Sequence, residues 1–513
     1  MASRGPDDAG TWYDPSDRVA LAHRRLAVID PHATGHQPMV SRFGEHIITF
    51  NGEIYNFPAL RRKLEDAGYG FHTESDTEVL LALYHFHGDA MFGHLRGMYA
   101  MAIWDATQER LLLARDPYGI KPLYYTRRGN GFAFASQVRA LLAGGQISRE
   151  VDPAGEAGFL LTGSVPEPWT WYRDIACLPA GSCLWVDQNG PGKAFQHTDV
   201  ARLIARPGEP TWQPEEVTKR VRESLLDSVQ HHLVADIPVG LFLSAGIDSG
   251  ALAGLAMELR DQPLQTMTLG FKEYAGSSQD EMPIARTVSR HFGTHHHERL
   301  VTRSEFEDDL PAIIEAMDQP SIDGINTWFI SKAAAEQGLR VMLSGVGGDE
   351  MFGGYPSFQD IPRWHRRWGW ISAIPGLPAL AWSARGLGIA GRLSTKAWAL
   401  PRYAGTPGGA YLLRRGLFMP EEISQLMDPE RAADGLRALN PPGCFEMEAQ
   451  TDDCRISAME SRFYLRNQLL RDIDWSAMAH SVEVRTPLVD LELTRSLASN
   501  LVERRRKDFL AHT

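Results

Sequence analysis

The chain has 513 residues, of which 43% are hydrophobic, so it can bury more than one core and is expected to form about two or three domains. Acidic residues outnumber Lys and Arg by 64 to 52, a formal net charge of −12 that argues against nucleic acid as a partner. Four cysteines lack metal-ligand spacing, the N-terminus lacks the apolar core of a signal peptide, and no apolar run reaches the roughly 18 residues of a membrane span. We therefore expect a cytoplasmic protein without a membrane partner.

Residues 1 to about 145 are predicted to form short strands, tight turns and helices. Strands are expected at 19–29 and 46–50, a turn at Asn51-Gly52, helices at 59–67 and 77–87, and a hairpin of buried strands at 97–104 and 110–115. This order favours a layered sandwich. Prolines spread over 146–215 predict a connector after it.

From about residue 216 strands and helices alternate, the pattern of a doubly wound parallel sheet. Helices are expected at 218–233, 250–259 and 284–292, and strands at 239–243, 264–271 and 338–344. Ligands of such sheets bind beyond the carboxyl ends of the strands, so the loops that follow these strands are the first places to look for a site.

The loop Ser244-Ala-Gly-Ile-Asp-Ser249 joins a buried strand to a helix through small residues. Free backbone N–H groups and the positive end of the helix dipole suit an anion there, and the small side chains allow a polyphosphate to approach. The loop is neither a Walker A loop nor a Gly-x-Gly-x-x-Gly loop. Asp248 adds a carboxylate, which indicates Mg²⁺ between it and a pyrophosphate; the alternative is an ordinary strand-turn-helix corner.

A second glycine-rich loop, Ser344-Gly-Val-Gly-Gly-Asp-Glu350, follows the strand predicted at 338–344. Its Asp349 is placed like Asp248, so the two loops are predicted to face one nucleotide and share its metal ions. Two unrelated turns are the alternative.

Several longer motifs occur in one order over nearly the whole chain. They are Arg4-Gly-Pro-Asp-Asp8, His23-Arg-Arg-Leu-Ala-Val-Ile-Asp30, Asn51-Gly-Glu-Ile-Tyr-Asn56, Ser75-Asp-Thr-Glu-Val79, Ala114-Arg-Asp-Pro-Tyr-Gly-Ile-Lys-Pro-Leu-Tyr-Tyr125, and the segments 244–249, 344–355 and 476–487. In these motifs the chain resembles the glutamine-hydrolysing asparagine synthetases. The resemblance implies an α/β and α+β chain: an Ntn-type αββα glutaminase sandwich (1–190), a connector (191–215), and a doubly wound parallel-sheet ATP-pyrophosphatase domain (216–513).

The resemblance also implies chemistry at two sites: glutamine hydrolysis in the first domain, and passage of ammonia to a carboxylate that ATP has adenylated in the second. It implies that Arg25, Asn51, Gly52, Glu53 and Asp76 bind glutamine, with Asn51 and Gly52 as the oxyanion hole. For ATP it implies Leu243, Ser244, Ala245, Gly246, Asp248, Ser249, Leu269, Ser344 and Gly345, with Asp248 and Asp349 on Mg²⁺. Glutamine, ATP and a carboxylic acid such as aspartate are the expected partners, and a homodimer is left open.

The first departure from the family pattern concerns the nucleophile. The family uses a cysteine at the mature N-terminus, whereas residue 2 here is Ala and the first cysteine is Cys177. We therefore expect the polypeptide as given not to hydrolyse glutamine. There are two explanations: a leading segment that carries the cysteine is missing, or the domain has lost its activity and serves as a scaffold. The retained glutamine-pocket residues favour the first.

Further departures concern the synthetase half. Val346 stands where members of the family commonly carry an acidic residue, and Glu350 is a substitute that more readily serves the fold. The family usually continues past the end of this chain and carries a lysine near the α-phosphate there. Here Lys507 follows three arginines and is predicted to lie in a solvated, charged helix end.

Two classes of function follow from these patterns. The first is an ATP-dependent amide ligase acting on aspartate by default, or on another acid such as a sugar or secondary-metabolite carboxylate, with an intramolecular amide former as a variant. The second is a catalytically impaired relative that only binds nucleotide or a partner. Outside the motifs, 295–297 are expected at the entry of a strand, 362–370 in an amphipathic surface helix, and 379–400 in a helical insertion.

Overall fold

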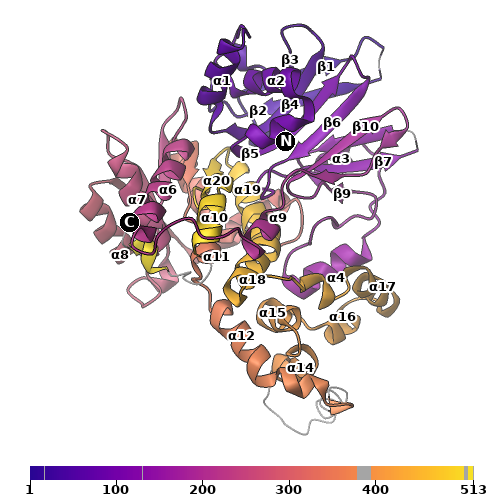
Figure 1. Cartoon of the computed structure of the whole chain (residues 1–513), viewed down its shortest axis with the longest axis vertical. Coiled ribbons are helices and arrows are strands. Elements are labelled where there is room, and N and C mark those ends of the chain that lie inside the picture. Colours follow the sequence, from indigo (N-terminus) through magenta and orange to yellow (C-terminus); the bar gives the residue numbers. More distant parts are fainter. Residues whose placement is uncertain (17, 130, 378–379, 381–393, 502–506, 512–513) are drawn as a thin grey trace.

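In the computed structural model, the N-terminal part is built around one antiparallel sheet (Figure 1). The structure describes residues 1–513 except 17, 130, 378–379, 381–393, 502–506 and 512–513. The strand order in the sheet is β11-β10-β6-β5-β4-β3, and β12 pairs with β10. The strands are β3 (Met39–Val40), β4 (His46–Ile54), β5 (Gly97–Asp105), β6 (Arg110–Arg115), β10 (Ser182–Asp187), β11 (Gly190–Pro191) and β12 (Phe195–Gln196).

Helices and smaller sheets cover the two faces of this sheet. Helices α1 (Phe57–Asp66) and α2 (Asp76–His87) pack on one face, and the Ser75 hydroxyl caps α2 by accepting a hydrogen bond from Thr77 N–H. A second apolar core joins the other face to the hairpin β1 (Asp8–Tyr13)–β2 (Ala20–Arg25) and to the sheet β8 (Gly131–Ala135)–β7 (Tyr124–Arg128)–β9 (Ala176–Cys177). Helix α3 (Val138–Ala143) closes the outside, so the predicted αββα sandwich is confirmed.

Two local predictions in this part are wrong. Asn51-Gly52 does not turn; both residues continue β4 opposite Ala100 and Tyr99, and the turn comes after Ile54. Gly52 has φ +152°, and a Cβ there would lie 2.0 Å from the Met98 carbonyl oxygen, so close strand packing explains the glycine. The proline-rich stretch 146–215 is not all connector, because it contains β10, which pairs with β6, and helices α4 (Pro153–Thr162) and α5 (Val200–Ala205).

The predicted doubly wound sheet is confirmed as five parallel strands in the order β15-β14-β13-β16-β17. They are β13 (Val239–Phe242), β14 (Gln265–Phe271), β15 (His295–Val301), β16 (Val341–Leu343) and β17 (Glu483–Arg485). One face packs against α6 (Val217–His232), α7 (Ile247–Glu258), α8 (Met282–Phe292) and α20 (Leu491–Asn500), the other against α10 (Ile325–Glu336) and α19 (Arg471–Met478). The chain order reverses between β13 and β16, which makes their carboxyl ends the switch point where ligands bind.

A helical region, orange to yellow at the bottom of Figure 1, extends beyond the parallel sheet. It contains α12 (Ser357–Trp368), α14 (Thr395–Tyr403), α15 (Pro407–Arg415), α16 (Pro420–Leu426), α17 (Pro429–Leu439), η6 (Gly443–Phe445), α18 (Asp452–Met459) and the π-helical η7 (Glu460–Leu470), and it has its own core with α4. Helix α12 confirms the amphipathic helix expected near 362–370, and most of 379–400 lies outside the described residues. In the described part of the chain, no helix is both long and apolar enough to cross a membrane.

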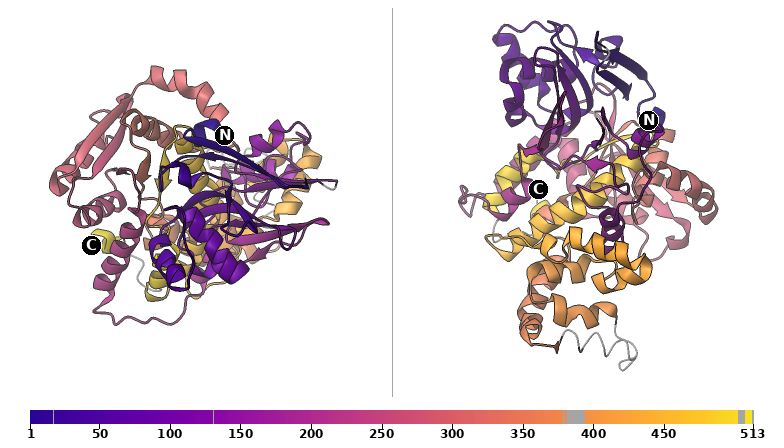
Figure 2. Two further views of the ribbon diagram at one scale, coloured as in Figure 1. Left: turned by 90° about the horizontal axis from the view of Figure 1, so that it is seen from above. Right: turned by 90° about the vertical axis from the view of Figure 1, so that its right-hand side faces the viewer.

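The sandwich sits directly on the parallel-sheet part, as both views of Figure 2 show. Buried two-pronged ion pairs join them: Arg4 to Asp474 at 2.7 and 2.9 Å, and Arg96 to Asp490 at 2.8 and 2.9 Å. Such planar pairs fix orientation as well as distance. The two predicted sites are therefore held in one fixed arrangement.

Candidate functional site

The first loop of the candidate nucleotide site lies where β13 ends and α7 begins. Gly246 is the N-cap of α7 and offers no side chain to the free N–H groups of the first turn; Gly246 is exposed and Ala245 is half-buried. Ser244 and Ser249 close the loop, with 2.9 Å between their hydroxyl oxygens. Ala245 is not among the described residues with positive φ, so alanine fits here without backbone strain. The loop can accept an anion at the helix N-terminus.

The second loop, between β16 and α11 (Gly348–Phe352), packs directly on the first. A Cβ on Gly345 would lie 3.0 Å from the Ser249 nitrogen, and one on Gly348 would lie 2.5 Å from Asp248 Cγ. Glycine is thus required for the two loops to touch. The prediction that Asp248 and Asp349 face one site agrees with this geometry.

Lys507 joins the two carboxylates, and the prediction that it lies in a solvated helix end is wrong. Its ammonium group lies 3.2 Å from Asp248 Oδ2 and also pairs with Asp349 Oδ1. The turn that carries it leads into α21 (Asp508–Ala511), which packs beside α6 and α7, where Leu510 enters the core (Figure 1). The basic run before Lys507 hid this placement. The apolar Phe509-Leu510 pair that follows was the sequence signal of a packed segment.

The chemistry of these side chains fits Mg²⁺ and a polyphosphate. Asp248 Oδ1 is buried and has no hydrogen-bond partner, which leaves a carboxylate oxygen free for a hard cation. Burial raises the pKa of Asp248 to about 6, Lys507 lowers it, and the nearby Asp349 raises it. A divalent ion would relieve the repulsion between the two carboxylates, and a phosphate would take up the ammonium group.

The remaining residues predicted for ATP lie around the loops. Ser344 donates its backbone N–H to the Arg485 carbonyl at 2.8 Å, which ties the second loop to β17. Leu243 is 1% exposed and packs in the core, and Leu269 is half-buried on β14 beside Phe271. Contact of either leucine with adenosine stays a prediction.

Val346 and Glu350 differ in what they can offer a reaction. The half-buried side chain of Val346 packs among apolar residues and carries no proton acceptor. Glu350 is 2% exposed and accepts a hydrogen bond from the Tyr355 hydroxyl at 3.1 Å. Burial raises the pKa of Glu350 to about 8, so it is largely protonated at neutral pH.

The N-terminal cavity is a separate opening of about 740 Å³ between the sandwich sheets and the synthetase part. All five residues predicted to bind glutamine line it, namely Arg25, Asn51, Gly52, Glu53 and Asp76. Its lining also includes Met1 and, from the synthetase part, Met478 and Glu483. The volume is ample for an amino acid.

Polar side chains of this lining already have partners in the scaffold, Arg25 and Asp76 among them. Arg25 donates to the carbonyl oxygens of Ile29 and Asp30 at 2.9 and 2.6 Å, so its guanidinium is partly engaged by the backbone. Asp76 Oδ2 accepts the Ile54 N–H at 3.0 Å, and burial raises the pKa of Asp76 to about 6. An ammonium group beside Asp76 would favour its charged form.

A buried charge network connects the N-terminal cavity to the nucleotide loops. Arg485 is fully buried; its Nε lies 2.9 Å from Glu483 Oε1 and its Nη2 lies 3.4 Å from Glu53 Oε2. The Arg485 carbonyl is the group that holds Ser344. One residue therefore contacts both predicted sites, a role that the Glu-Val-Arg pattern at 483–485 did not reveal.

None of the four cysteines lines the N-terminal cavity, and all four are among the described residues. Cys177 and Cys183 are buried in the sandwich, and burial raises the pKa of the Cys177 thiol to about 11. Such a thiol carries almost no thiolate at neutral pH. Among the described residues, no cysteine lies at this cavity. That the polypeptide as given does not hydrolyse glutamine stays a prediction.

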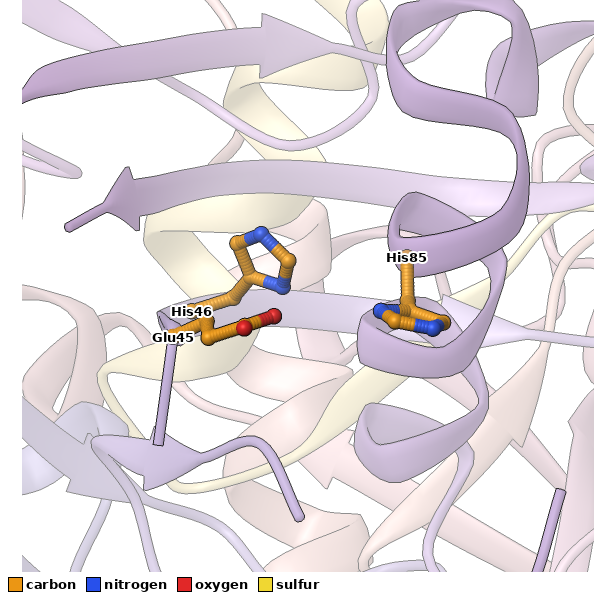
Figure 3. A group of neighbouring side chains, drawn as sticks. All are labelled: Glu45, His46 and His85. Atoms are coloured by element: carbon orange, nitrogen blue, oxygen red, sulfur yellow. The ribbon is translucent and has the colours of Figure 1, made fainter. Parts of the chain in front are cut away.

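Glu45, His46 and His85 form a cluster where β4 begins, beside α2 (Figure 3). One ligand atom from each lies within 4.8 Å of the others, and His46 Nδ1 is buried without a hydrogen-bond partner. Two imidazoles and a carboxylate are ligands that suit Zn²⁺. Glu45 and His85 are exposed, and the cluster lies outside both predicted sites.

Comparison with known proteins agrees with this division of the chain. Residues 1–195 match the family described as glutamine amidotransferase domain, and residues 220–505 match asparagine synthase. The chain is 31% identical to "Asparagine synthetase [glutamine-hydrolyzing] 1" of Bacillus subtilis, over 96% of this chain and 75% of that protein.

Two further relatives are covered over less than two thirds of their length. The chain is 36% identical to "Putative asparagine synthetase [glutamine-hydrolyzing]" of Mycobacterium tuberculosis, over 70% of this chain and 56% of that protein. It is 33% identical to "Asparagine synthetase B [glutamine-hydrolyzing]" of Escherichia coli, over 71% of this chain and 61% of that protein. The chain therefore belongs to the asparagine synthetase family, whose members join a glutamine amidotransferase domain to an asparagine synthase domain.

Proposed function

We propose that the protein is an ATP-dependent carbon-nitrogen ligase that converts a carboxylate to an amide, with aspartate as the default acceptor. The observation that carries the proposal is the meeting of Asp248, Asp349 and Lys507 between two loops at the carboxyl ends of the central strands β13 and β16. Membership of the family supports the reaction class. The cofactors are ATP and Mg²⁺.

In this proposal the acceptor carboxylate attacks the α-phosphorus of ATP. A bond forms between a carboxylate oxygen and phosphorus, the bond to the β-phosphate oxygen breaks, and pyrophosphate leaves. The loop 244–249 would hold the phosphates with its N–H groups, and Lys507 would pair with a phosphate oxygen. Asp248 and Asp349 would hold Mg²⁺, which neutralises phosphate charge when bound. Lys507 must then exchange its carboxylate partners for phosphate.

Ammonia then attacks the acyl carbon of the acyl-adenylate, AMP leaves, and the nitrogen loses a proton. Val346 offers no base for that proton. Glu350 is close in sequence, but it is buried and its pKa is raised to about 8. Below that pH most of the Glu350 side chains are protonated, and only the minor, charged form can accept a proton. Solvent or the departing phosphate groups would take the proton.

The N-terminal cavity is proposed to bind glutamine as the ammonia source, through Arg25, Asp76, Glu53 and the Asn51 and Gly52 positions. The family relationship and the cavity lining support this assignment. The expectation that the polypeptide as given releases no glutamate from glutamine is part of the proposal, because no cysteine among the described residues lies at the cavity.

Pyrophosphate release from ATP, measured with Mg²⁺, ammonium and a panel of carboxylic acids, tests the proposal. Release that depends on both ATP and one acid, with formation of that acid's amide, is the expected result. Release with an acid other than aspartate would favour the alternative acceptor classes. Nucleotide binding without release for any acid would contradict the ligase and favour the impaired relative.

A further inference from the structure

A second cavity, which we call the arginine cavity, lies apart from the N-terminal cavity. It has a volume of about 600 Å³ and is lined by residues of α4, the segment 164–169, α15, η6 and η7. Pockets of about 300–1,000 Å³ hold drug-sized ligands, so the space is much larger than aspartate requires. Trp169, Leu417 and Phe463 contribute apolar surface to its lining.

The charged side chains of this cavity are mostly cationic. Its described lining residues include a single carboxylate, Glu167, and five cationic side chains: Lys396, Arg414, Arg415, Arg462 and Arg466. That carboxylate is already paired with Arg115. Outside the lining, Asp360 pairs with Arg414 at 3.3 Å and Glu460 pairs with Arg415 at 2.9 Å, so part of the positive charge is balanced. The remaining excess suits a ligand with more than one anionic group.

Two of the guanidinium groups have unused hydrogen-bond donors. Arg466 donates to the Tyr118 carbonyl at 3.3 Å and lies within ion-pair distance of no carboxylate in the described part of the chain. Burial lowers the pKa of Arg466, and the nearby Arg115 and Arg462 lower it further. Arg415 binds Glu460 through Nε at 2.9 Å, while its Nη2 is buried and has no partner. A buried donor left unpaired is costly, and a bound carboxylate would satisfy it.

One wall of the arginine cavity is continuous with the second nucleotide loop. The Arg415 guanidinium lies 3.8 Å from the ring centre of Tyr464 and 4.5 Å from that of Tyr355. Tyr355 in turn donates to Glu350, the residue after Asp349. A chain of contacts through Arg415, Tyr355 and Glu350 thus connects the cavity wall to the nucleotide loop.

We propose that the arginine cavity binds the acceptor of the amidation, and that this acceptor is a carboxylic acid with at least two anionic groups and an apolar body larger than aspartate. This inference rests on the proposed ligase function and replaces aspartate, its default acceptor, with a larger acid. The cationic lining, the unpaired donors of Arg415 and Arg466, the apolar wall and the continuity with Asp349 select this class of ligand. The carboxylate to be adenylated would project past Tyr355 toward the nucleotide loop.

Isothermal titration calorimetry with N-benzyloxycarbonyl-L-aspartate, a dicarboxylate with an aromatic body, and with L-aspartate tests the inference. The wild-type protein is expected to bind the larger acid at least tenfold more tightly. The double variant Arg462→Gln/Arg466→Gln is expected to lose at least tenfold of that affinity. Arg437→Gln, on the exposed face of α17 where Arg437 pairs with Asp434, is the matched control and should change nothing.

Leu417→Trp is a second variant, and it leaves every charge in place. Leu417 lines the cavity and is 41% exposed, so the larger indole adds bulk at the cavity wall. It is expected to weaken binding of the larger acid at least fivefold. Thermal melting of all variants checks the fold. Equal affinity for the two acids, no binding of the larger one, or losses no greater than in the control would overturn the inference.

Pyrophosphate release separates this inference from the proposed function. Release with aspartate whose KM is unchanged in the double variant would overturn the arginine cavity as the acceptor site and leave the ligase standing. Binding of the larger acid that the double variant abolishes, without release for any acid, would contradict the ligase and support an anion site in the cavity.

Discussion

The nucleotide loops and the N-terminal cavity hold their charged groups in different ways. Among the described residues, Lys507 is the only cation within ion-pair distance of Asp248 and Asp349; it comes from a distant segment, and the surrounding loop residues are small and partly exposed. In the N-terminal cavity, Arg25 and Asp76 are buried and bind backbone groups of the sandwich.

At the nucleotide loops, a ligand can replace one partner of the existing ion pairs. In the N-terminal cavity, the polar groups that would bind a ligand also stabilise the scaffold. A magnesium-nucleotide complex can replace Lys507 on the carboxylates and offer the lysine a phosphate. A ligand in the N-terminal cavity must add to bonds that already exist. Arg485 is where the two regions meet, since its side chain reaches Glu53 and its carbonyl holds Ser344.

Arg485→Met is expected to have the largest effect, because it breaks the shared network. Glu53 would be left buried without a cation and Glu483 with only Lys121 at 3.7 Å, and breaking a buried pair in this way typically costs about 3–5 kcal/mol of the free energy of unfolding. Urea denaturation measures the loss, with Arg437→Met on the exposed face of α17 as the control. A loss below about 1 kcal/mol would show that the two regions are held together by other contacts.

Asp349→Asn is expected to act on the nucleotide loops alone. Loss of the carboxylate should lower acid-dependent pyrophosphate release at least about 100-fold, equivalent to about 2.7 kcal/mol, with little change in thermal stability because Asp349 is partly exposed. Asp434→Asn, at an exposed ion pair of α17, is the control. Unchanged release in Asp349→Asn would remove this residue from the metal site.

The pH dependence of Mg²⁺ binding tests whether Asp248 at the nucleotide loops is a metal ligand. Metal binding needs the charged form of Asp248, whose pKa is raised to about 6, so Mg²⁺ affinity should be constant above about pH 7 and fall about tenfold per unit below about pH 6. Calorimetric titration with MgCl₂ and a non-cleavable ATP analogue at several pH values measures this. In Asp248→Asn the slope near pH 6 should disappear; a slope that persists there would assign it to another group.

Lys507→Met is expected to have the smallest and the opposite effect. Removing the ammonium group frees both carboxylates, so affinity for Mg²⁺ without nucleotide should rise about threefold to tenfold, while affinity for ATP falls. Titration of both ligands separates the two changes. Lower Mg²⁺ affinity in the variant would show that Lys507 does not compete with the metal ion.

Predictions from the sequence were correct where neighbouring residues determine the structure. The run 239–243 and the small residues after it specify a strand, a loop and a helix by local propensity, and the His295-His-His297 segment does enter β15 as expected. Asn51-Gly52 was misjudged, because pairing with β5 over nine residue positions outweighs the local preference for a turn.

The misjudged site residues depend on contacts between distant segments. Lys507 reaches Asp248 only because Phe509 and Leu510 anchor the last helix on the core of the parallel sheet. Arg485 reaches Glu53 only because the sandwich docks on β17. Neither contact has a periodicity or spacing that a single sequence displays, so both required the structure.

The most direct test of the account is isotopic. When an acceptor acid whose carboxylate carries ¹⁸O is amidated in the presence of ATP, Mg²⁺ and ammonium, the account predicts one ¹⁸O atom in the AMP released, because the carboxylate oxygen bonds to the α-phosphorus and leaves with it. Mass spectrometry of AMP measures the transfer. Amide formation with unlabelled AMP, or with ADP and phosphate as products, would contradict adenylation at the Asp248 and Asp349 loops.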